Sequence, residues 1–127
     1  MHRESVSPAE AWSRFYGFAD GVIRSVELHL DGPRQAIVEL DAQEPPNSDG
    51  PWWRVHFDFI GLAEWRFEQI RSDMLVIFDA RLATIGDLTY VSFDAATLPE
   101  EPSANEFRGS CAYAAAERVE LLLRPLT

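Results

Sequence analysis

The chain has 127 residues and a mass of 14.4 kDa, with 46% hydrophobic and 25% charged residues, values that are typical of a single globular domain and not of a disordered segment. It carries 21 Asp and Glu against 11 Lys and Arg, which gives a formal net charge of −10 and a pI of about 4.6. This balance argues against binding to nucleic acid or to an anionic membrane, and it favours a basic protein as the partner.

The single cysteine and the amino-terminal residues indicate the compartment. Cys111 is the only cysteine, so no intrachain disulfide can form. The first twelve residues lack the apolar stretch of a signal peptide, and no apolar run reaches membrane-spanning length. We therefore expect a cytoplasmic protein whose fold depends on its hydrophobic core.

A short helix is predicted near the amino terminus. Ser7–Glu10 has the form of a capping box with proline at the first helical position, in which Ser7 and Glu10 each bond the other's backbone amide. Asp20-Gly21 is expected to end the helix. One apolar stripe at helical spacing is expected to pack on a sheet: Trp12, Phe15, Tyr16 and Ala19.

From Val22 onward the hydrophobic period changes to two, which predicts strands. The first predicted hairpin places Leu30 opposite Ala36 and Leu28 opposite Val38. Both apolar rows then share one face only if the connecting loop has an odd number of residues. Residues 42–51 are rich in proline and turn formers, so we expect an exposed loop there.

The next alternating segment predicts a second hairpin. Gly61 lies between two runs of alternating residues, and a loop at Ile60–Leu62 would align Phe57 with Trp65. The expected core-facing residues of this hairpin are Trp53, Val55, Phe57, Phe59, Ala63, Trp65 and Phe67.

The opposite face of this predicted hairpin is the candidate binding surface. In the expected register Arg54 faces Glu68, and Asp58 faces Glu64. Tryptophan and arginine are the residues most often found at binding hot spots, although Trp52 could instead be covered by the preceding loop or by the helix. The candidate binding residues are Trp52, Arg54, His56, Asp58, Glu64, Arg66 and Glu68.

The last third of the chain predicts further strands. Residues 74–85 and 88–94 form a hairpin in which Gly86-Asp87 makes a type II′ turn and Leu82 lies opposite Val91. Residues 97–105 are expected to form an acidic loop. Residues 110–118 are rich in alanine and could be helical, but we favour a strand in which Cys111, Tyr113 and Ala115 share the core-facing phase of Val119.

These elements predict one mainly β domain over residues 1–127. Its fold class is α+β, with a short helix followed by about seven antiparallel strands in hairpins that form a sandwich or an open barrel.

No motif specifies a reaction, so we predict no catalytic residue, no cofactor and no metal. The chain contains no phosphate-binding glycine loop, no CxxC, no HExxH and no calcium loop. His56 and Asp58 could supply two metal ligands, but a solvated polar row is favoured. Cys111 lies in an apolar setting that raises the pKa of a thiol, so we interpret it as a small core residue and not as a nucleophile.

Three stretches carry a resemblance: WWRVHFDFIGLAEWRFE, VIFDARLATIGDLTYVSFD and AERVELLL. Over about residues 22–124 the chain resembles small bacterial proteins of the immunity type, which neutralise toxins delivered by rival or sibling cells. The resemblance implies a β-rich fold, residence in the cytoplasm and an acidic face for a basic toxin domain. No functional residue can be transferred from it.

The predicted function is therefore a non-enzymatic protein-binding domain, such as an acidic immunity-type inhibitor of a basic toxin. Two alternatives stay open. The first is a small-ligand-binding β-barrel with a partly hollow interior, or an enzyme of unrecognised type. The second is a homodimer that uses Trp52 and a free edge strand.

Overall fold

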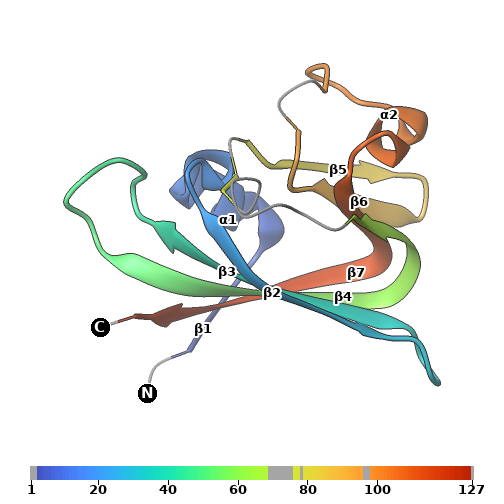
Figure 1. The fold of residues 1–127 in the computed structure, drawn as a ribbon, viewed down its shortest axis with the longest axis horizontal. Helices are drawn as coiled ribbons and strands as arrows, with labels where there is room; N and C mark the ends of the chain where they lie inside the picture. The colour runs from blue at the N-terminus through green and yellow to red at the C-terminus, as the bar shows by residue number, and fades with distance from the viewer. Residues whose placement is uncertain (1–2, 69–75, 78, 96–97, 127) are drawn as a thin grey trace.

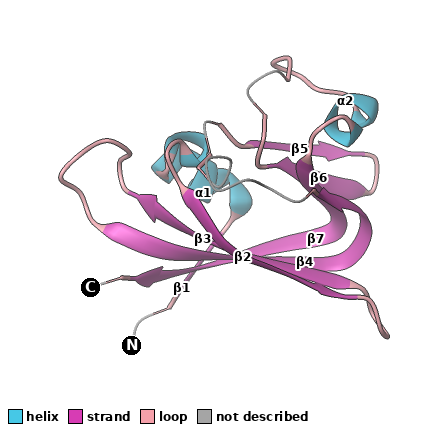
Figure 2. Cartoon of the chain, in the orientation of Figure 1, coloured by secondary structure: helices cyan, strands magenta, loops and turns pink. Residues whose placement is uncertain are grey.

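The chain folds into one open antiparallel sheet, as seen in a computed structural model that describes residues 3–68, 76–77, 79–95 and 98–126 (Figures 1 and 2). Six of the seven strands within these residues run in the order β2-β3-β4-β7-β6-β5, and the seventh, β1, pairs with β7. The prediction of a mainly antiparallel β fold is confirmed, and the sheet is not closed into a barrel. The elements are β1 (Glu4–Val6), α1 (Pro8–Arg14), η1 (Tyr16–Phe18), β2 (Val22–His29), β3 (Gln35–Gln43), β4 (Trp52–Phe67), β5 (Arg81–Ile85), β6 (Leu88–Ser92), α2 (Ala104–Arg108) and β7 (Ala112–Pro125).

The amino-terminal helix begins where its capping residues predict. The Ser7 side chain accepts a hydrogen bond from the Glu10 amide at 3.1 Å, while the Glu10 carboxylate lies 3.6 Å from Nη1 of Arg14. The helix ends at Arg14, earlier than predicted, and a 3₁₀ turn follows. Because of this early end, the predicted apolar stripe is wrong at Tyr16, which is 66% exposed, and Phe18 is buried in its place.

The first predicted hairpin forms, but its register is wrong by two residues. Leu28 pairs with Ala36 and Val26 with Val38, so the loop spans residues 30–34. The loop length is odd, as the alternation requires, and the faces are therefore as predicted. The loop has the five residues 30–34 instead of 31–35, which leaves Leu30 outside the ladder.

The second predicted hairpin is wrong, because β4 does not turn at Gly61. It continues as one 16-residue strand that pairs along its whole length with β7. Gly61 has φ 71°, and a Cβ at this position would lie 2.8 Å from Cδ of Glu117 on β7. Phe59 and Leu62 both enter the core although they are three residues apart, and a register shift follows Leu62. Gly61 thus marks a corner at which both long strands bend.

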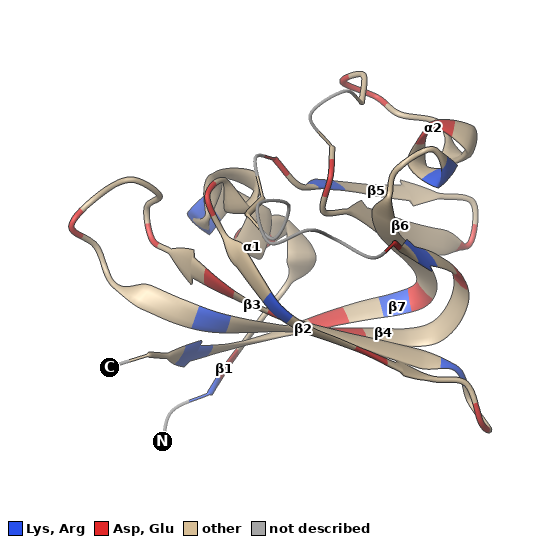
Figure 3. Cartoon of the chain, in the orientation of Figure 1, with Lys and Arg blue, Asp and Glu red and all other residues tan. Residues whose placement is uncertain are grey.

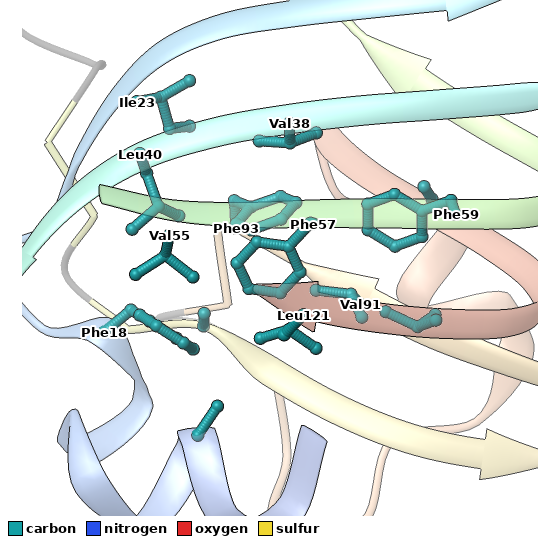
Figure 4. Packing of buried hydrophobic residues seen from close by; sticks show 14 of the residues in the cluster. Phe18, Ile23, Val38, Leu40, Val55, Phe57, Phe59, Val91, Phe93 and Leu121 are labelled. Atoms are coloured by element: carbon teal, nitrogen blue, oxygen red, sulfur yellow. The ribbon is translucent and has the colours of Figure 1, made fainter. Parts of the chain in front are cut away.

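The corner folds the sheet over its own apolar face. In Figure 1, α1 and the β5–β6 hairpin lie above the strands β2, β3, β4 and β7, whereas only β1 and the termini lie below them. Phe57 packs edge-to-face on Phe93, with ring centroids 5.2 Å apart, and edge-on to Phe18 at 5.4 Å (Figure 4). Each of these rings is buried, so the main core joins β4, β6 and η1.

A second apolar cluster lies under α2. Tyr90, Phe107, Tyr113 and Ala115 are its buried members. The strand predicted over residues 110–118 is confirmed from Ala112, but its phase is wrong: Tyr113 and Ala115 face α2 and not the main core. The phase changes because β7 bends opposite Gly61.

The β5–β6 hairpin is close to its prediction. Leu82 pairs with Val91, and Gly86 has φ 63° while Asp87 does not have a positive φ, as a type II′ turn requires. The described strand begins at Arg81, and the beginning of the predicted strand lies outside the described residues. The loop predicted over residues 97–105 is wrong at its end, because a capping box of Ser103 and Glu106 starts α2.

None of the helices in the described ranges has the length and apolar character that would be needed to cross a lipid bilayer.

Candidate binding surface

One face of the sheet is open, and it carries the first group of predicted binding residues. We call the side of β2, β3, β4 and β7 that points away from the main core the outer face. A groove of about 330 Å³ lies on it. Ile37 and Leu122 supply apolar surface to this groove, and the remaining lining residues are Arg3, Glu27, Glu39, Arg54, His56, Leu123 and Arg124.

Asp41 holds Arg54, one of the residues that line the groove. Its carboxylate is buried and accepts hydrogen bonds from Nε of both Arg54 and Arg24, the latter at 2.7 Å. Burial alone would raise the pKa of Asp41, but the bonds from Arg54 and Arg24 outweigh it and hold the pKa below its ordinary value. The hydrogen bond from Arg54 to Asp41 also keeps the pKa of Arg54 above its ordinary value. The orientation of Arg54 is therefore set before any partner arrives.

The remaining polar residues of this group are held across strands. Nδ1 of His56 lies 3.7 Å from Oε2 of Glu39, the residue directly opposite on β3. Asp58 accepts a hydrogen bond of 2.6 Å from Gln35. Trp52 begins β4 on the same face and is 40% exposed, so the interpretation in which a loop or helix covers it is not favoured. Side chains that are fixed in this way lose little conformational entropy on binding.

The second group of predicted residues lies beyond the corner and does not join the groove. Glu64 accepts two hydrogen bonds from Arg108 of α2, at 2.8 and 2.9 Å, and one of 3.0 Å from the hydroxyl of Tyr90. The bonds from Arg108, with a smaller contribution from Tyr90, hold the pKa of Glu64 below its ordinary value against the opposing effect of burial. Glu64 therefore anchors α2 to the sheet, and the predicted contact between Asp58 and Glu64 is wrong.

Arg66 and Glu68 form a loose pair at the far end of β4. Nη1 of Arg66 lies 3.9 Å from Oε1 of Glu68, and about half of each side chain is exposed. The predicted pairing of Glu68 with Arg54 is wrong, because Arg54 bonds Asp41 on β3 instead.

Cys111 has the character of a protonated thiol. Burial, followed by the hydrogen bond to Asp94, raises the pKa of Cys111 to about 11. The thiol is therefore protonated at neutral pH. The interpretation of Cys111 as a core residue is wrong, because it is only partly buried and donates to the carboxylate of Asp94. The backbone amide of Glu68, the residue after the end of β4, donates a hydrogen bond to the carbonyl oxygen of Cys111, so Cys111 lies at that end of β4. His56 lies near the other end of the strand. The histidine is thus not placed to act as a base for this thiol.

The outer face holds no recognisable metal site. Within the described ranges, no group of three or more His, Cys, Asp or Glu side chains comes together as a set of metal ligands. His56 lies beside Glu39, and Asp58 accepts a hydrogen bond from Gln35, both on β3.

Charge is unevenly distributed over the molecule. All 11 basic residues are arginines. Figure 3 shows basic positions just before β1 and on β4 and β7 near the termini, and acidic positions on the segment before α2, while α2 itself carries both an acidic and a basic position. Asp94 and Glu106 line a second, smaller pocket of about 240 Å³ beside that segment. The groove is therefore mixed in charge, while the α2 end is acidic.

Sequence reasoning predicted only two of the nine groove-lining residues, Arg54 and His56, and it missed the β3 residues Ile37 and Glu39 together with Asp41, which bonds Arg54. A signal for them was present, because Ile37, Glu39 and Asp41 alternate with the buried residues of β3 in the same way that Arg54 and His56 do on β4. The pairing of β3 with β4 brings these two rows side by side.

Comparison with protein-family models, with curated proteins and with solved structures finds no match for this chain.

Proposed function

We propose that this chain is a non-catalytic protein-binding domain that acts in the cytoplasm and binds a basic partner through the outer face of its sheet. The observation that supports it most is the open outer face itself. Arg24 and Arg54 are already held there by cross-strand hydrogen bonds to Asp41, and Ile37 and Leu122 supply apolar surface beside them. A pre-ordered surface of this kind, with an exposed tryptophan beside it, has the composition of a protein-recognition site.

The net charge supports the choice of a basic partner. At −10, the chain attracts a basic protein over distances at which individual contacts do not yet matter. Near the groove, Glu27 and Glu39 can accept from arginine or lysine side chains of the partner. Association is therefore expected to be fast at low salt and to weaken as salt rises.

The test is capture of the partner by the immobilised protein, with a matched pair of variants. Trp52→Ala removes the exposed aromatic side chain beside the groove, and Tyr16→Ala removes an exposed aromatic side chain on the helical side of the molecule. We expect the captured protein to be basic, to elute as salt is raised, and to be lost with Trp52→Ala but kept with Tyr16→Ala. Equal retention by both variants would refute the outer face as the binding surface.

A finer form of the proposal is that the partner is a basic toxin domain and that binding inhibits it. The acidity of the chain and its resemblance to immunity-type proteins support this form. Co-expression with the captured protein tests it: the wild-type chain should restore growth that the partner arrests, and Trp52→Ala should not. Binding without any protection would leave a binding domain that is not an inhibitor.

A further inference from the structure

The strand β2 forms an outer edge of the sheet. It pairs with β3 on one side, and on its other side the only pairing within the described residues is the single bridge between Val22 and Val76. The backbone from Arg24 to Leu30 therefore offers unpaired donors and acceptors there, so far as the described chain shows. The opposite edge, β5, has five residues, and its first residue, Arg81, already donates to the carbonyl oxygens of Pro99 and Glu100.

This edge has two distinct rows of side chains. Leu28 and Leu30 are 39% and 48% exposed. Leu28 pairs with the buried Ala36 and so lies on the core side of the sheet with the half-buried Val26, and Leu30 follows the last residue of β2. Glu27 and His29 lie on the outer face, with Nε2 of His29 3.5 Å from Oε2 of Glu27. A free strand edge with neighbouring exposed leucines on one side is an association surface.

We propose that two copies of this chain pair through their β2 edges, antiparallel, around a two-fold axis at Leu28. Residues opposite each other in an antiparallel pair point to the same side of the sheet. A two-fold axis perpendicular to the sheet keeps the core side of both copies on one side and the outer face of both copies on the other. An even-numbered residue must therefore lie opposite an even-numbered residue, and an odd-numbered residue opposite an odd-numbered one. The axis must therefore pass through a residue and not between two residues, and Val26, Glu27 and Leu28 are the residues nearest the middle of the free edge.

Only one of these three axes gives complementary contacts. An axis at Val26 places Leu28 opposite Arg24, whose side chain is bonded to Asp41 on the outer face. An axis at Glu27 places two like charges in direct contact. An axis at Leu28 places Leu28 against Leu28.

The same axis at Leu28 also satisfies the flanking positions. Val26 then faces Leu30 of the second copy, and Glu27 faces His29 of the second copy. These contacts occur twice by symmetry, and they extend the apolar face of one sheet into the next.

Disulfide trapping tests both the interface and its register. In a Cys111→Ser background, Leu28→Cys should cross-link to itself under mild oxidation, because opposed Cα atoms in an antiparallel pair lie about 4.5–5.5 Å apart, within disulfide range. Leu30→Cys should not cross-link to itself, since the two copies of this residue are about 13 Å apart in this register. Leu30→Cys mixed with Val26→Cys should cross-link.

The oligomeric state provides the second test, by sedimentation equilibrium of the full chain. Leu28→Glu should weaken the dimer at least about tenfold, whereas Tyr16→Glu, which also adds a charge at an exposed apolar residue, should leave it unchanged. Added salt should strengthen the dimer, because it screens the repulsion between two chains of charge −10. This salt dependence is opposite in sign to that expected for the complex with a basic partner, so the two proposals can fail independently.

Two results would overturn the dimer. The first is a monomer at every concentration and salt tested. The second is self-cross-linking of Leu30→Cys as readily as of Leu28→Cys, which would show a different register or random collision.

Discussion

Replacing Asp41 with asparagine tests whether the ion pairs of the outer face hold the sheet together. The side chain of Asp41 is 8% exposed, that of Arg54 is 25% exposed and that of Arg24 is 55% exposed. A hydrogen bond between charged groups in a shielded setting contributes about 1.5–3 kcal/mol, which applies to Arg54. An exposed ion pair contributes about 0.2–1 kcal/mol, which applies to Arg24. We therefore expect Asp41→Asn to lower the free energy of unfolding by about 2–3 kcal/mol at neutral pH.

Asp58→Asn is the matched control. Asp58 lies on the same face, but it accepts only from the neutral amide of Gln35, and asparagine can still accept that bond. The expected loss is about 1 kcal/mol or less. Urea denaturation of the wild type and both variants measures these differences. The slope of the unfolding free energy against urea concentration is expected to be the same for all three proteins.

The pH dependence identifies the group responsible. The pKa of Asp41 is lower in the folded chain, so its contribution is complete above the unfolded value of about 3.9 and is lost as pH falls through the folded value. Arg24 and Arg54 stay charged throughout. The difference in the free energy of unfolding between wild type and Asp41→Asn should therefore be constant from about pH 7 to pH 5 and should decrease only below about pH 4. A free-energy difference that disappears above pH 5, or an Asp41→Asn variant as stable as Asp58→Asn, would refute the reasoning.

Further predictions concern the corner, the core and the thiol. Gly61→Ala should destabilise the chain by about 1 kcal/mol more than Gly32→Ala. Both glycines have φ near 70°, but only at Gly61 would the added Cβ lie within 2.8 Å of Glu117. Combining Gly61→Ala with Glu117→Ala should remove this additional destabilisation, as measured by thermal denaturation. Phe57→Ala should cost about 3–5 kcal/mol, and a loss below 1 kcal/mol would contradict its place in the core. Cys111 should react slowly with a disulfide reagent at pH 7 and faster as pH rises toward 11, whereas full reaction within seconds at pH 7 would contradict a protonated thiol.

The alternation of side chains was sufficient to predict the faces of the strands. Val55 and Phe57 are buried, while Arg54 and His56 lie on the outer face, as the two-residue period requires. This pattern sorts side chains between faces because every inward position of a strand must be apolar. It carries no information about which strand lies next to which.

Strand partners are where the prediction went wrong, and Gly61 shows why. A glycine between two alternating runs is typical of a hairpin, and the apolar rows around it fit either a turn or a straight continuation. The partner of β4 is β7, whose residues come more than forty positions later in the chain. Local sequence cannot choose between these pairings, because both bury the same apolar side chains.

The helix α2 was missed for a different reason. Its capping box, Ser103 with Glu106, was present in the sequence, but the surrounding acidic and proline residues favoured a loop. Five residues are too few for a hydrophobic period to be recognised. The ion pair of Arg108 with Glu64 joins two segments that are distant in the sequence, so the covered position of Glu64 could not be predicted either.

The corner at Gly61 and the free edge of β2 together suggest how the outer face would be used. Beyond the corner α2 covers the outer side of the sheet, so recognition is limited to the strands on the β2 side. A two-fold axis perpendicular to the sheet at Leu28 would place both outer faces on the same side of the dimer, each with its groove. A partner carrying two linked binding sites should then bind the wild type more tightly than the Leu28→Glu variant, whereas a single-site partner should bind both equally. Titration of a one-site and a tandem two-site form of the partner measures this difference, and equal affinities for the tandem form would show that the two grooves do not act together.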